Sequence, residues 1–117
     1  MRGGPRMPRV NELLREVIAE EVRTLKDPAI GFVTITGVDT SPDLRTANVF
    51  YTALGTEEER AETAAALRRA TPHIQSRLGA QVRIKYTPAL DFRVDESIET
   101  GMRIDALLRE IEHDDES

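Results

Sequence analysis

The chain of 117 residues contains no cysteine and no tryptophan, and Phe and Tyr together supply only 4% of it. Without cysteine it can form no disulfide framework, no thiolate metal site and no cysteine nucleophile. With so few aromatic side chains, a broad platform on which nucleic-acid bases could stack is not expected.

Long hydrophobic runs are also missing. No apolar stretch approaches the length of a transmembrane helix, and the basic N-terminal segment MRGGPRMPR lacks the apolar run of a secretory signal. We therefore expect a cytoplasmic protein with no membrane attachment. The length and the hydrophobic fraction of 39% fit one domain with a single modest core.

The charges are distributed unevenly. The formal net charge of −5 argues, taken alone, against a nucleic-acid partner, but the acids are concentrated in residues 56–62 and 110–117. Between residues 64 and 94 the only acid is Asp91, against the bases Arg68, Arg69, Arg77, Arg83, Lys85 and Arg93. The N-terminal segment adds Arg2, Arg6 and Arg9 before the first acid, Glu12. This distribution favours a local phosphate-binding patch.

The pattern of apolar residues predicts the order helix, strand, strand, broken helix, strand, helix. The first helix covers residues 8–26, and the alternating segments 31–38 and 44–54 form an antiparallel hairpin around the turn SPDL, with a bulge or twist at Gly37. Thr56 and Glu59 form a capping box at the start of the next helix. The third strand covers residues 80–86 and continues extended to residue 95, and a last helix follows to Ile111. Phe32, Phe50 and Phe92 are expected in the core.

These elements predict an α+β fold in which a three-stranded sheet has helices packed on one face. The other face of the sheet would meet water or a partner. Nothing in the sequence indicates a second domain, and we expect a monomer.

Proline interrupts an otherwise helical segment, LRRATPHIQSRLG at residues 67–79. Pro72 has no N–H to donate, so the sequence predicts a break with Thr71 as the cap of a second short helix. The N–H groups of His73 and Ile74 would then be unpaired donors at a helix N-terminus, which favours anion binding. A simpler interpretation is that the kink only bends the helix around the core, with the arginines as solubilising surface.

Four stretches give the chain a family resemblance: RVNELLREVIAEEV, DPAIGFVTITGVDTSPDLRTANVFYT, LRRATPHIQSRLG and TPALDFRVDESIETGMRID. In order and spacing they resemble the ribosome-binding factor A family of bacterial small-subunit assembly factors. The resemblance implies a type II KH-like domain with a kinked central helix. It also implies that an Ala-x-Gly kink replaces the Gly-x-x-Gly loop of KH domains. The matching positions are Ala70, Thr71 and Pro72, so proline stands where the family usually has glycine.

The resemblance further implies a function. Such a factor binds the free small ribosomal subunit, assists late maturation of its RNA near the 5′ terminal helix, and supports growth in the cold. A ribosome-associated GTPase assists its release. We expect no cofactor, metal or catalytic residue. The predicted RNA-binding residues are Arg68, Arg69, Thr71, Pro72, His73, Ser76, Arg77, Arg83, Lys85, Arg6 and Arg9.

The expected domain organisation has three parts. Residues 1–7 are predicted to be a flexible basic arm, residues 8–112 the KH-like RNA-binding domain, and residues 113–117 an acidic disordered tail.

The residues alone leave two other function classes open, an enzyme and a protein-interaction module. Asp91 and Asp95, with Glu96 and Glu99 nearby, could form a carboxylate metal or hydrolase site, although their positions on an extended segment and a helix cap favour a structural role. His73 has no carboxylate or nucleophile at triad spacing. A protein-interaction module could instead use the open face of the sheet.

Overall fold

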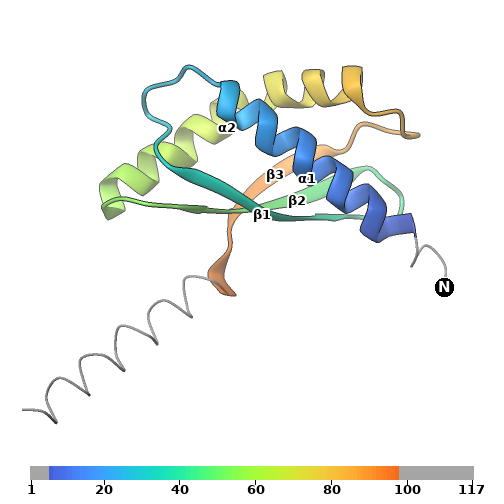
Figure 1. The fold of residues 1–117 in the computed structure, drawn as a ribbon, viewed down its shortest axis with the longest axis horizontal. Helices are drawn as coiled ribbons and strands as arrows, with labels where there is room; N and C mark the ends of the chain where they lie inside the picture. The colour runs from blue at the N-terminus through green and yellow to red at the C-terminus, as the bar shows by residue number, and fades with distance from the viewer. Residues whose placement is uncertain (1–5, 98–117) are drawn as a thin grey trace, which may run out of the picture.

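The computed structural model describes the backbone of residues 6–97 and the side chains from residue 8 onward. Five elements follow in order: α1 (Arg6–Thr24), β1 (Val33–Thr40), β2 (Thr46–Ala53), α2 (Glu57–Gln81) and β3 (Ala89–Val94). The strands form one sheet in the order β1-β2-β3. Both helices lie on the same side of this sheet (Figure 1), which confirms the predicted α+β architecture. Residues 1–5 of the predicted arm at residues 1–7, the last helix and the tail lie outside the described residues.

Helix α1 begins at Arg6, two residues before the predicted start, with Pro8 in its first turn, where proline is tolerated. Leu14, Ile18 and Val22 repeat at helical spacing and are at most 6% exposed, because they cover the sheet. The opposite face carries ion pairs such as that of Arg15 with Glu12. None of the described helices is long and apolar enough to cross a membrane.

Strands β1 and β2 form the predicted antiparallel hairpin. Ile35 pairs with Tyr51 and Gly37 with Phe50, so Thr36 is the extra residue of a β-bulge, and the irregularity expected at Gly37 is confirmed. Because of this bulge, Ile35 and Val38 both face the core although they are three positions apart.

The turn between these strands lies at the predicted SPDL segment. Leu44 adopts a positive φ of 64° there, and its N–H donates to the carbonyl of Ser41 at 2.9 Å. The side chain of Asp43 accepts from the Ser41 hydroxyl at 2.7 Å and from the Arg45 N–H at 3.1 Å. These two bonds, the hydroxyl first, hold the pKa of Asp43 below its ordinary value.

The capping box at the start of α2 is confirmed. The Glu59 N–H donates to the Thr56 hydroxyl at 3.1 Å, and the Thr56 N–H donates to the Glu59 carboxylate at 2.8 Å. Gly55 precedes the cap with a φ of 128°, a conformation that L side chains rarely adopt. A Cβ at this position would lie 2.9 Å from the Glu59 carboxylate.

Helix α2 is kinked but not broken. It continues from Glu57 through Pro72 to Gln81, and it changes direction about half-way along its length (Figure 1). The kinked central helix is therefore confirmed, whereas the separate second helix is wrong. Thr71 is not an N-cap, because its hydroxyl donates back to the carbonyl of Leu67 at 2.8 Å. The missing N–H of Pro72 leaves the Arg68 carbonyl without its helical donor, which accounts for the bend.

The third strand lies further along the chain than predicted. Residues 82–88 are a connection, and β3 starts at Ala89, where it pairs in parallel with β2. The prediction was wrong because α2 continues past Gly79 to Gln81, into the residues assigned to the strand. The missing side chain of Gly79 instead makes room for Thr87, whose hydroxyl would lie 2.9 Å from an added Cβ.

The core lies between the helices and the sheet. It joins Leu14 and Ile18 of α1 to Val49 of β2 and to Leu67 and Ile74 of α2, all fully buried. The expectation for the phenylalanines holds only in part. Phe50 and Phe92 are half-buried, but Phe32 is 81% exposed, because it precedes β1 at the end of the sheet, beyond the cover of the helices.

Candidate nucleic-acid interface

The predicted basic residues of α2 are exposed on the surface of that helix. Arg68, Arg69, Pro72, His73, Ser76 and Arg77 are all exposed, and Thr71 is half-buried. Arg83 and Lys85 are exposed on the connection that follows α2. The helix and the connection after it thus present a series of basic side chains to solvent. Pro72 and the small polar Ser76 lie between them on α2.

Two of these arginines also form ion pairs within the protein. Nε of Arg77 lies 3.5 Å from Oε1 of Glu21, a residue of α1 that is only 7% exposed. Nε2 of Gln81 donates to the other oxygen of Glu21 at 2.7 Å. The side chain of Arg77 therefore links α2 to α1 while remaining about half exposed.

Arg69 has a comparable contact with the loop after α1. Its guanidinium donates to Oδ2 of Asp27 at 2.9 Å, and the other carboxylate oxygen accepts from the Ala29 N–H at 2.9 Å. The Ala29 N–H and, after it, the Arg69 guanidinium hold the pKa of Asp27 below its ordinary value. Asp27 therefore stays ionised at neutral pH and neutralises part of the Arg69 charge.

Arg68 and His73 differ from these two arginines. Among the described side chains neither forms an ion pair, and both are exposed. The cationic group most available to a phosphate on α2 is therefore Arg68, beside the exposed imidazole of His73, with Arg69 and Arg77 available after exchange of their carboxylate partners.

The predicted anion site at backbone N–H groups is not formed. In a continuous helix each interior N–H donates to the carbonyl four residues earlier, so His73 and Ile74 have no role as free donors at a helix start. The side chain of Ile74 is fully buried in the core. Any anion binding at this part of α2 must rest on side chains.

A contact that the sequence did not predict joins the hairpin turn to the connection after α2. The Arg45 guanidinium lies 4.4 Å from the centre of the Tyr86 ring and donates to its hydroxyl at 3.2 Å. The ammonium of Lys85 lies 5.4 Å from the same ring. No local pattern could have shown this, because Arg45 and Tyr86 are far apart in the sequence.

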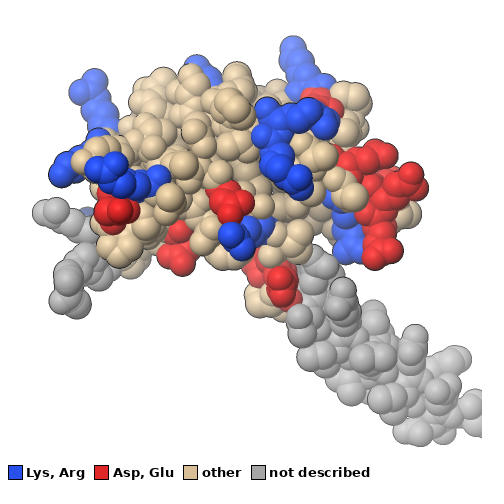
Figure 2. Space-filling model, turned by 180° about the vertical axis from the view of Figure 1, so that it is seen from behind, with Lys and Arg blue, Asp and Glu red and all other residues tan. Residues whose placement is uncertain are grey.

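The basic surface therefore extends from α2 to the tip of the hairpin. Figure 2 shows the largest group of red side chains at one end of the molecule, where α2 begins, and blue side chains at the opposite end and across the face between. Arg9 of α1 is exposed, and the side chain of Arg6 lies outside the described part of the chain.

The carboxylates considered for a catalytic site have other partners. Asp91 pairs with Arg93 at 2.8 Å, whereas Asp95 accepts from the Thr36 hydroxyl at 2.6 Å and from the Ser97 hydroxyl. No group of three side chains in the described part of the chain is suited to hold a metal ion.

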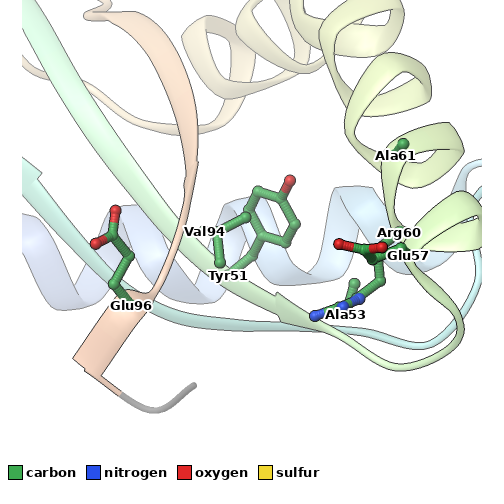
Figure 3. Close-up of a pocket in the computed structure, with 7 residues that line it drawn as sticks. All are labelled: Tyr51, Ala53, Glu57, Arg60, Ala61, Val94 and Glu96. Atoms are coloured by element: carbon green, nitrogen blue, oxygen red, sulfur yellow. The ribbon is translucent and has the colours of Figure 1, made fainter. Parts of the chain in front are cut away.

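An open hollow of about 400 Å³ lies between the first turn of α2 and the ends of β2 and β3. Tyr51, Glu57, Arg60 and Glu96 line it together with small apolar side chains. In Figure 3, Glu57 and Arg60 lie together on α2, and Glu96 lies beyond Tyr51 and Val94 on the other side. The two carboxylates do not converge on one point, which gives no support to acid–base catalysis here.

Comparison with known proteins agrees with this geometry. The family profile described as Ribosome-binding factor A matches residues 6–108. A relative with that name from Geobacter sulfurreducens is 45% identical over 108 residues, which cover 92% of each chain. The chain belongs to the ribosome-binding factor A family.

The solved structures give the same result. The crystal structure of ribosome-binding factor A from Thermus thermophilus superposes with a TM-score of 0.69 at 28% identity, covering 75% of this chain and 94% of the other. A second match is to a homology model of the Thermus thermophilus factor, fitted into the cryo-EM map of a 30S–RbfA complex. This match has a TM-score of 0.60 at 30% identity, and the aligned part covers 71% of this chain and 88% of the other. The fold is thus the type II KH-like fold of this family.

Proposed function

We propose that this protein binds the free small ribosomal subunit and assists the late maturation of its RNA near the 5′ terminal helix. Family membership across residues 6–108 is the single observation that carries this proposal. The 30S complex of the Thermus thermophilus relative points to the same partner. In this view the protein acts as a monomer in the cytoplasm, by binding and without catalysis. It supports growth in the cold, and a ribosome-associated GTPase assists its release.

The basic surface of α2 and the following connection would contact the RNA. Arg68 offers a charge that no described carboxylate neutralises, His73 offers an exposed hydrogen-bond donor beside it, and Arg83 and Lys85 continue the surface toward the hairpin tip. Ser76 and the backbone around Thr71 and Pro72 would lie against the same stretch of the RNA sugar-phosphate backbone. Exposed guanidinium groups suit this role because they bind phosphate oxygens in pairs.

Arg69 and Arg77 would join this interface by exchanging partners. Each has a carboxylate within ion-pair distance, Asp27 and Glu21 respectively, and each side chain is more than half exposed. A phosphate can therefore reach the open side of either guanidinium. The N-terminal residues Arg6 and Arg9 would add phosphate contacts at the start of α1.

Co-sedimentation on sucrose gradients tests this proposal. The protein is mixed with free small subunits, with large subunits and with whole ribosomes, and we expect it to migrate with the free small subunits only. Salt should reduce the association, since phosphate contacts release counterions. Equal migration with all three particles, or with none, would contradict the proposal.

A further inference from the structure

Two large apolar side chains lie exposed at the end of the sheet where α2 begins. Phe32 is 81% exposed and Leu54 is 65% exposed. The Leu54 N–H donates to the Phe32 carbonyl at 3.0 Å, so the hairpin pairing continues to these two residues. Side chains directly opposite each other in an antiparallel pair project from the same face, so the two form one apolar patch. Contiguous exposed apolar side chains mark surfaces where partners bind.

The patch borders an open hollow of about 420 Å³. Pro28, Phe32 and Leu54 contribute apolar walls. The remaining walls include the carboxylates Glu59 and Glu62 of α2, and no basic side chain of the described residues lines this hollow. A ligand that fits here has one large apolar group and positive charge beside it.

The acidic character of this end has a clear structural origin. Glu57, Glu58 and Glu59 occupy the first turn of α2, where the helix dipole stabilises negative charge. The Thr56 N–H and hydroxyl hold the pKa of Glu59 below its ordinary value, which keeps that carboxylate ionised. Arg60, the cation of the same turn, lines the other hollow, toward Tyr51 (Figure 3). The α2 wall of this hollow therefore repels phosphate and attracts cationic groups, whereas Arg23 lines a second hollow beside Phe32.

We propose that Phe32, Leu54, Glu59 and Glu62 form a docking site for a protein segment that is rich in lysine or arginine and carries one large apolar residue. On the small subunit the occupant is such a basic segment of a ribosomal protein. The negative charge around the hollow favours this partner over RNA. The inference rests on the proposed function, because the partner is sought on the ribosomal subunit.

The test compares binding to two probes, intact small subunits and protein-free small-subunit RNA. Phe32→Ser and Leu54→Ser should each weaken binding to subunits roughly tenfold, as expected for an apolar anchor, and leave binding to the RNA unchanged. Glu62→Gln should weaken subunit binding less and make it less sensitive to salt. Leu13→Ser is the matched control, because Leu13 is 46% exposed on α1 away from the hollow, and it should bind both probes like the wild type.

A photo-crosslinking variant, Phe32→p-benzoylphenylalanine, identifies the occupant within the subunit complex. A crosslink to a basic segment of a ribosomal protein supports the proposal. A crosslink to RNA or to a second copy of this chain overturns it, as does wild-type subunit affinity in Phe32→Ser. An equal loss on both probes overturns it as well. If the wild-type protein itself fails to bind subunits, the proposed function has failed instead.

Discussion

Nε of Arg77 lies 3.5 Å from Oε1 of Glu21, and this ion pair joins the surface proposed to bind RNA to the packing of α2 against α1. The Arg77 side chain is 53% exposed, whereas that of Glu21 is 9% exposed. A substitution of Arg77 therefore alters both RNA binding and the surroundings of a buried carboxylate, and its two effects need separate measurements.

The first prediction separates these effects. Arg77→Ala removes the ion pair with the buried Glu21 and leaves that carboxylate the hydrogen bond from Gln81, so we expect the free energy of unfolding to fall by about 1–2 kcal/mol. Arg68→Ala is the control, because no ion pair of Arg68 is lost and its effect should stay within about 0.5 kcal/mol. Urea unfolding followed by circular dichroism gives both values. Equal stability of the two variants would show that Arg77 has no structural role.

The second prediction concerns pH. The pKa of Asp27 is lowered in the folded protein by the Ala29 N–H and the Arg69 guanidinium. Its ionised form thus stabilises the fold at pH values above the unfolded pKa of about 4, and this stabilisation is lost as the pH falls toward the lower folded pKa. The advantage of the wild type over Asp27→Asn should therefore narrow below about pH 4. Urea unfolding between pH 3 and pH 7 measures it.

Arg69→Ala provides the internal control for that series. It removes the second of the two causes and leaves the Ala29 N–H, so the pKa of Asp27 should rise toward its ordinary value without reaching it. NMR titration of the Asp27 carboxyl carbon reports this directly. A wild-type pKa at or above the ordinary value would show that neither contact persists in solution.

The third prediction concerns the glycine before the capping box. Gly55→Ala should destabilise the protein by about 1–2 kcal/mol, because a side chain is strained at a φ of 128° and its Cβ would lie 2.9 Å from the Glu59 carboxylate. Gly37→Ala is the matched control, since no atom lies within 4 Å of a Cβ there. Thermal unfolding of both variants makes the comparison. The expectation fails if Gly37→Ala is the more damaging change.

The fourth prediction concerns the bend of α2. Pro72→Ala restores an N–H for the Arg68 carbonyl and should straighten the helix, which moves Arg68 and His73 relative to each other and weakens subunit binding. Pro72→Gly also restores the N–H but tolerates bent backbone, so it should keep more of the binding. The subunit affinity of the two variants, with amide chemical shifts of residues 68–76, distinguishes them. Identical affinities would mean that the bend serves packing alone.

Much of the fold was predictable because local patterns determine it. The helical repeat of Leu14, Ile18 and Val22, the alternation in the hairpin and the capping box of Thr56 with Glu59 each depend on neighbouring residues. The kink at Pro72 was predicted, but as a break with a second helix beyond it, whereas α2 is continuous. The sequence could not show whether the helix breaks or bends there. The bend is decided by tertiary packing, because Ile74 and Leu78 remain in the core beyond Pro72.

The missed features depend on contacts between distant segments. Residues 80–86 alternate like a strand, but the sheet position beside β2 is taken by Ala89–Val94. Phe32 is a large apolar residue of the type expected in a core, but it lies just beyond the covered part of the sheet. The carboxylate partners of Arg69 and Arg77, and the stacking of Arg45 on Tyr86, require knowledge of how α1, the hairpin and α2 pack together.

The salt dependence of small-subunit binding tests the central claim most directly. The wild type is compared with a variant that combines Arg68→Ala, Arg83→Ala and Lys85→Ala, three exposed residues whose loss should leave folding intact. If the basic surface binds RNA phosphates, the variant should bind more weakly. Its log–log salt slope should be shallower by roughly 0.7–0.9 for each lost contact. Wild-type affinity together with a wild-type slope would contradict the account and exclude this surface from RNA binding.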